Sequence, residues 1–155
     1  MDLVEKYAKG STIIKEAISG ITADQLKAVP EAGGWSIHQI VIHVVDAEIV
    51  YTGRIKQAVA EEAPKILPYD QDRWTARLDY HKLDMMLYIQ LFNLLRQVNA
   101  QFLRNISDTD WQRRGYHAED GALTVQEMVE RLVEHVDVHT AKIKKLHRLI
   151  LEGQE

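Results

Sequence analysis

The sequence predicts an all-α protein built as a four-helix bundle, and three observations lead to this prediction. All three prolines, Pro30, Pro64 and Pro68, lie in two short regions of the chain. The remaining long segments contain no proline and repeat their apolar residues with helical spacing. The alternating apolar and polar strings that half-buried strands need are absent from the sequence. Four helices with one apolar stripe each bury those stripes against one another, and we expect a single domain over residues 1–155.

The first helix is expected over residues 2–19. Its apolar stripe is formed by Leu3, Tyr7, Ile14 and Ile18. A long connection follows, in which Thr22 and, three residues later, Gln25 match the capping box of a short helical turn.

The second helix is expected to begin after Ser36, a favoured N-cap residue that has Gln39 three residues further on. It should end near residues 61–62, before Pro64. Its predicted stripe contains Ile37, Ile40, Val41, Val44, Ala47, Tyr51 and Ile55.

A second long connection, over residues 63–79, precedes the third helix, for which Asp79 is the expected N-cap. The stripe predicted to face the core is Leu83, Leu87, Leu91, Leu94, Val98 and Phe102. Because the connections before helices two and three are long, either can cross an end of the bundle, so a simple up-down order is not required.

The fourth helix is expected to begin after Thr124, which can form a capping box with Glu127, and to run to about residue 151. The segment before it, residues 106–122, should contain a helical turn of its own at 107–111.

Composition excludes several classes of function. The net charge is −4 and no run of Lys and Arg gives affinity for a phosphate backbone, so no nucleic-acid partner is expected. No apolar run approaches the roughly 20 residues that cross a bilayer. The acidic, amphipathic first residues do not resemble a secretory signal, so a cytoplasmic protein is expected. The absence of cysteine excludes disulfides, thiolate metal sites and cysteine nucleophiles.

Three histidines are the candidate functional residues. His135 and His139 are four residues apart, so on a helix they lie one turn apart on one face. Both lie in the apolar seam of the fourth helix, and His43 lies at the inner edge of the second. Three imidazoles could bind one divalent cation and leave coordination positions open, as in a reactive metal site. The alternative is that the three rings bond separately to backbone carbonyls or carboxylates.

The other four histidines are expected to be surface or capping residues. They are His38, His81, His117 and His147. Two known metal motifs are excluded as well. Val136, and not glutamate, follows His135, which excludes a zincin. No histidine has glutamate three positions before it, which excludes the ferritin-like di-iron pattern.

Several short motifs resemble those of the DinB/YfiT-like superfamily, a group of small bacterial metal-binding bundles. They occur in the expected order over nearly the whole chain. The motifs are Gly34-Trp35-Ser36-Ile37, His43-Val-Val-Asp46-Ala-Glu48, Tyr69-Asp70 with Trp74, Leu123-Thr124-Val125, and His135-x-x-x-His139.

The resemblance implies a four-helix bundle, a homodimer and a divalent metal ion held by His43, His135 and His139. Imidazole donors suit zinc, nickel, iron and copper, of which zinc or nickel is expected. The resemblance also implies a metal-dependent hydrolase, or an S-transferase that uses a low-molecular-weight thiol, acting on a small-molecule substrate.

Two classes of function stay open from the residues alone. In an enzyme, the metal ion would activate water or a thiol. In a binding module, the site would sequester or sense a metal or a small ligand, and a further protein ligand would close it. Asp46, one turn after His43, could orient an imidazole or act as a base, or it could be an ordinary surface carboxylate.

Overall fold

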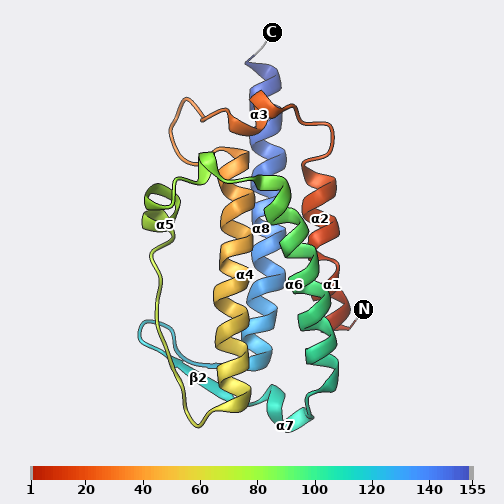
Figure 1. Cartoon of the computed structure of the whole chain (residues 1–155), viewed down its shortest axis with the longest axis vertical. Helices are drawn as coiled ribbons and strands as arrows, with labels where there is room; N and C mark the ends of the chain where they lie inside the picture. The colour runs from red at the N-terminus through yellow and green to blue at the C-terminus, as the bar shows by residue number, and fades with distance from the viewer. Residues whose placement is uncertain (1, 154–155) are drawn as a thin grey trace.

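The computed structural model describes residues 2–153, which form a bundle of long helices with a small sheet at one end (Figure 1). The first member of the bundle consists of two consecutive helices, α1 (Leu3–Ala8) and α2 (Gly10–Ala17). The other three are α4 (Ile37–Ala60), α6 (Met85–Asn105) and α8 (Val125–Glu152). This architecture confirms the predicted four-helix bundle.

Short elements fill the connections. They are α3 (Ala23–Lys27), β1 (Lys65–Ile66), α5 (Gln71–Arg77), the 3₁₀ helix η1 (Tyr80–Lys82), α7 (Asp108–Trp111), β2 (Arg114–His117) and β3 (Gly121–Thr124). The strands form a sheet in the order β1-β2-β3, in which β1 is parallel to β2 and β3 is antiparallel to it. The sequence did not predict this sheet, because strands of two to four residues are too short to show alternation.

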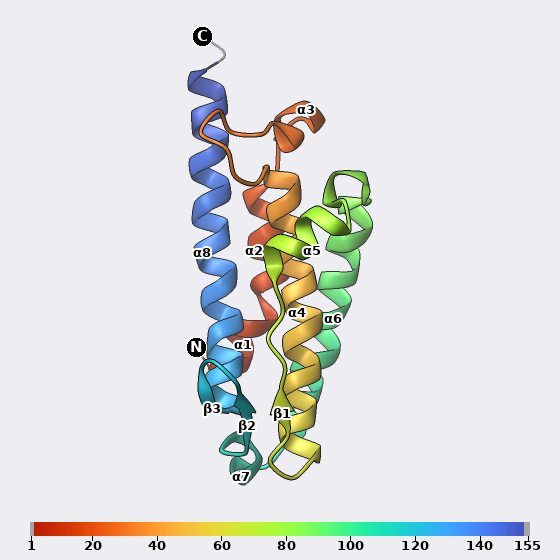
Figure 2. The same ribbon diagram turned by 90° about the vertical axis from the view of Figure 1, so that its left-hand side faces the viewer.

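The order of the helices is not simple up-down. In Figures 1 and 2, α4 and α6 run in one direction, whereas α1, α2 and α8 run in the other. Because α4 and α6 are parallel, the chain returns along α4 before α6 begins, and this return carries β1 and α5 (Figure 2). The long connection that the sequence predicted before the third helix is this crossover.

Side-chain caps begin the helices where the sequence predicted them. Thr22, Ser36 and Thr124 each form a capping box with the residue three positions later. The turn predicted at 107–111 is α7, which Ser107 caps. The predicted cap of the third helix is wrong. Asp79 has a left-handed backbone with φ of 50° and precedes η1, whereas Asp84 accepts hydrogen bonds from the first turn of α6.

The predicted core face of the third helix is also wrong. Four of its apolar residues are exposed, at 39–59%: Leu87, Leu91, Leu94 and Val98. The buried face of α6 instead carries Met85, Ile89, Phe92, Arg96, Asn99, Ala100 and Leu103. The prediction failed because apolar residues lie on two faces of this helix. The buried face also contains a charged residue, and hydrophobic periodicity assigns charged residues to the exposed face.

That charged residue belongs to a polar layer between the two apolar halves of the core. One half lies around Ile37–Val45 and the other around Ile55 and Val125–Leu132. Between them, the guanidinium of Arg96 lies 2.8 Å from the carboxylate of Glu48, and both side chains are buried. Arg96 also donates to the backbone carbonyls of Tyr7 and Leu132, at 2.6 and 3.1 Å. The Tyr7 hydroxyl in turn donates to Glu48.

The first predicted helix is divided into α1 and α2 at Lys9, beside this layer. Gly10 is buried against Arg96, and a Cβ atom there would lie 2.8 Å from Nη1 and 3.1 Å from Cζ. A side chain at position 10 therefore competes with a guanidinium that three helices hold in place.

No helix within residues 2–153 is long and apolar enough to cross a membrane.

We predict that Gly10→Ala lowers the free energy of unfolding by about 1–3 kcal/mol, because the new methyl group overpacks Arg96. Gly53→Ala is the matched control, since a Cβ atom at that exposed helical position meets nothing within 4 Å. It should raise stability by about 0.5–1 kcal/mol. Urea unfolding measures both, and a stabilising Gly10→Ala would contradict the proposed close contact.

We also predict that Arg96→Met costs about 3–5 kcal/mol, because it leaves the carboxylate of Glu48 buried and unpaired. Adding Glu48→Met should recover part of this loss. The control is Arg104→Met on the same helix, where the ion pair with Glu5 is half exposed and should contribute about 0–1 kcal/mol. Equal losses in Arg96→Met and Arg104→Met would refute the role of the buried pair.

Candidate metal centre

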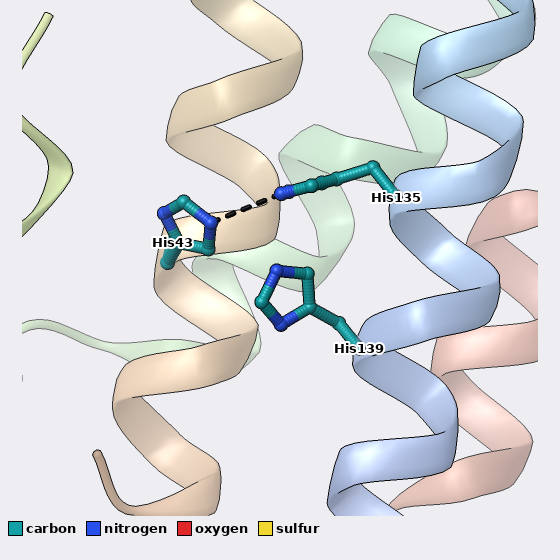
Figure 3. A group of neighbouring side chains, drawn as sticks. All are labelled: His43, His135 and His139. Carbon is teal, nitrogen blue, oxygen red and sulfur yellow. Dashed lines mark hydrogen bonds between the residues drawn. The ribbon is translucent and has the colours of Figure 1, made fainter. Parts of the chain in front are cut away.

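The three histidines that the sequence singled out lie together in the bundle. His43 comes from α4, and His135 and His139 come from α8. One possible ligand atom from each residue lies within 4.8 Å of the other two. The centroids of the rings are 4.3–4.9 Å apart, and Figure 3 shows the rings facing a common space.

The geometry of two neighbouring helices produces this cluster. Because α4 and α8 pack against each other, the face of α8 that carries His135 and His139 meets α4 at His43 (Figure 3). The ring of Trp35, just before the N-cap of α4, packs on His43 with 4.8 Å between ring centroids.

Hydrogen bonding does not account for the cluster. The Nε2 atoms of His43 and His135 are 3.0 Å apart, and this is the hydrogen bond that links the rings (Figure 3). The Nδ1 atoms of His43 and His139 are buried without a hydrogen-bond partner among residues 2–153. Across the same residues, none of the three rings bonds to a backbone carbonyl or a carboxylate, which removes the support for that alternative. Buried nitrogens without partners are costly, so the cluster requires another explanation.

The three imidazoles are neutral at neutral pH. Burial, with smaller contributions from His135, His139 and Lys142, lowers the pKa of His43 to about 3. Burial likewise lowers the pKa of His135 to about 3 and that of His139 to about 4. A neutral ring keeps a lone pair on one nitrogen, and this is the form that binds a metal ion.

Asp46 lies outside the cluster. Its side chain is buried, and its Oδ2 accepts a hydrogen bond of 2.5 Å from the hydroxyl of Tyr80 in η1. Burial raises the pKa of this carboxyl, whereas the bond from Tyr80 lowers it. Asp46 is therefore not an ordinary surface carboxylate. Its role in orienting an imidazole or acting as a base stays a prediction.

A pocket of about 370 Å³ adjoins the cluster at His135. It lies between α4, α8, the segment after β1 and the turn between β2 and β3. Its walls include Ala47, Tyr51, Arg54, Pro68, Tyr69, His117, Arg131, Leu132 and Val138. A small molecule in this pocket can therefore reach His135.

Two of the four remaining histidines are buried, which corrects the expectation that all are surface or capping residues. Nε2 of His38 lies 3.0 and 3.1 Å from the carbonyls of Tyr80 and Leu83. His117 lies on the buried side of β2 and lines the pocket. Arg54 of α4 also lines the pocket and had no predicted role. The unpredicted strand β2 carries His117 to the pocket, and the crossover supplies the wall of the pocket beside Arg54.

Comparisons with known proteins agree with the fold. A family model described as the DinB superfamily matches residues 12–143. A protein of Oceanobacillus iheyensis, named as a candidate metal-dependent hydrolase, is 29% identical over 134 residues, covering 86% of this chain and 77% of its own. The YfiT protein of Bacillus subtilis carries the same description and is 29% identical over 136 residues, covering 87% and 76%.

The solved structure of YfiT from Bacillus subtilis is similar to this fold throughout. It matches with a TM-score of 0.89 and 27% identity, over 96% of this chain and 85% of that one. It is described as having an unusual four-helix bundle topology. The family match covers most of the sequence and confirms the resemblance seen in its motifs, so the chain belongs to the DinB superfamily.

Proposed function

We propose that this protein is a metal-dependent enzyme in which His43, His135 and His139 hold one divalent ion beside a substrate pocket. One observation carries the proposal: three neutral imidazoles, one buried and two half-buried, converge within 4.8 Å at the edge of a pocket of about 370 Å³. The relatives named as metal-dependent hydrolases support it.

The donor set fits a catalytic ion better than a structural one. Three imidazoles and no thiolate suit zinc or nickel, and three protein ligands leave a coordination position open. A closed storage site would need a further protein ligand, for which Asp46 was the nearest candidate. The carboxylate of Asp46 is instead bound by Tyr80. This favours the enzyme over the non-catalytic binding module.

The ion would supply Lewis acidity that activates a water molecule or a thiol as nucleophile near neutral pH. The chain supplies the rest. Burial keeps all three imidazoles unprotonated, so their lone pairs are available. The pocket beside His135 holds the substrate near the site and limits the access of bulk water. The names of the relatives favour hydrolysis, and S-transfer to or from a small thiol is the second candidate.

The expected partners are proposals of the same kind. The pocket volume suits a small-molecule substrate. The homodimer is supported by the exposed apolar residues of α6, where Leu87, Leu91, Leu94 and Val98 form a stripe that a second copy could cover.

We predict that the purified, untagged protein binds about one divalent ion per chain, and that His135→Ala abolishes this binding because it removes one of three ligands. His147→Ala is the control, since His147 lies outside the cluster. Elemental analysis after dialysis measures the metal content per chain. Chelation should also lower the melting temperature of the wild type but not that of His135→Ala, because the ion stabilises only the folded state that binds it. Full metal content in His135→Ala would remove this residue from the site.

For activity, we predict that the zinc- or nickel-loaded protein hydrolyses activated esters or amides, or conjugates a small thiol to an electrophile. The metal-free protein and His135→Ala should both lose this activity, whereas His147→Ala should keep it. Initial rates with each substrate class measure the effect. Rates that do not respond to the metal would contradict the enzyme, and metal binding without any turnover would favour the binding module.

A further inference from the structure

The pocket contains a buried positive charge for which the fold gives no negative partner. Arg54 is only 7% exposed, although it lines the pocket. No carboxylate lies within ion-pair distance of it among residues 2–153. A buried guanidinium without a counter-charge is unfavourable, since burial removes the water that would solvate it.

The contacts of Arg54 hold the guanidinium in place but leave most of its donors free. One nitrogen donates to the backbone carbonyl of Leu67 at 2.6 Å. Its Cζ atom lies 4.8 Å from the ring centroid of Tyr51 and 5.9 Å from that of Tyr69. A guanidinium has five N–H donors in a planar fork, so the single bond to Leu67 leaves enough of them for a carboxylate or phosphate.

A second donor lies in the same pocket. His117 is 9% exposed, and its Nδ1 accepts hydrogen bonds of 3.2 Å from the backbone N–H groups of Glu119 and Asp120. Because Nδ1 is an acceptor, the ring proton is on Nε2, which is therefore a hydrogen-bond donor. The turn between β2 and β3 thus fixes the tautomer of this residue.

The acidic residues near the pocket do not neutralise Arg54. Asp120 pairs with Arg131 at 2.6 Å, and the bond from Arg131 is the main cause that lowers the pKa of Asp120, with a smaller contribution from the charge of Arg54. Glu119 and Glu134 line the pocket but are exposed to water, which weakens the interaction of their charges with Arg54. The buried wall of the pocket is therefore positive.

The position of Arg54 also indicates the length of the ligand. Ala47, one turn after His43, and Arg54 both line the pocket, and they are separated by about 10 Å of helix axis. On the antiparallel α8, His135 and then Leu132 and Arg131 run in the same direction along the pocket. Ala47 and Leu132 make the stretch between His135 and Arg54 apolar.

We propose that the pocket binds an elongated small molecule through a terminal carboxylate or phosphate held by Arg54 and His117, with its reacting group beside His135. This assignment of the substrate class rests on the proposed function for the reacting end. The anion subsite itself does not require the metal, so the two proposals can fail separately.

The test uses hexanoate, its neutral isostere hexanamide, and hexyl phosphate as probes, added to protein that has been freed of metal by chelation. Nuclear magnetic resonance follows the side-chain N–H signals of Arg54 and His117, and titration gives the affinities. Hexanoate or hexyl phosphate should shift these signals saturably, and the one that binds more tightly identifies the oxyanion. Hexanamide should bind about tenfold more weakly or worse, because it lacks the charge.

Variants separate the subsite from general charge effects. Arg54→Gln should weaken the binding of the anionic probe about tenfold or more, and Arg54→Lys should recover part of it. Arg148→Gln, the same charge change at an exposed position of α8, should bind as the wild type does. An affinity for hexanamide equal to that for the tighter anionic probe, unshifted Arg54 signals, or wild-type affinity in Arg54→Gln would each overturn the proposal. If Arg54→Gln does not fold, the comparison of the three probes in the wild type still tests whether the pocket binds an anion.

Discussion

A single buried ion pair fixes how the four members of this bundle pack. Arg96 on α6 contacts Glu48 on α4, the carbonyl of Tyr7 on α1 and the carbonyl of Leu132 on α8. Burying two charges costs free energy, so the ion pair adds little net stability to the folded state. Its geometric consequence is large, because any sliding of one helix along another would separate buried charges. The polar layer therefore specifies one register among the many that apolar stripes alone would allow.

That register places the candidate metal centre. Leu132 lies one turn before His135, and Glu48 lies little more than one turn after His43, so Arg96 ties α8 and α4 together beside the histidine cluster. The imidazoles converge only if α4 and α8 hold this alignment. The charge of Arg96 also contributes, after burial and His139, to the lowered pKa of His135. One interaction thus supports both the geometry of the site and the neutrality of a ligand.

The sequence predicted the parts of the structure that depend on local signals. Thr22, Ser36 and Thr124 begin their helices as expected, because a cap is a contact over three residues. The pairing of His135 with His139 follows from one turn of helix. The convergence with His43 needed the packing of two helices, and the apolar seams of both indicated it.

The predictions that failed concern features that depend on contacts between distant segments of the chain. Leu87 and Leu94 on α6 look like core residues, but tertiary packing buried the face with Arg96 instead. Aspartate is a favoured N-cap residue, but Asp79 has a left-handed backbone and precedes η1 instead of α6. Arg54 and His117 had no local signal, since a crossover and a sheet that periodicity cannot detect form the pocket around them.

The central claim is that His43, His135 and His139 share one ion. The most direct measurement is a crystal structure of the zinc- or nickel-loaded protein, with anomalous diffraction recorded on either side of the metal absorption edge. We predict one anomalous peak per chain, within bonding distance of a nitrogen from each of the three rings, with a coordination position open toward the pocket. A peak elsewhere, or none between the rings at full loading, would contradict the claim.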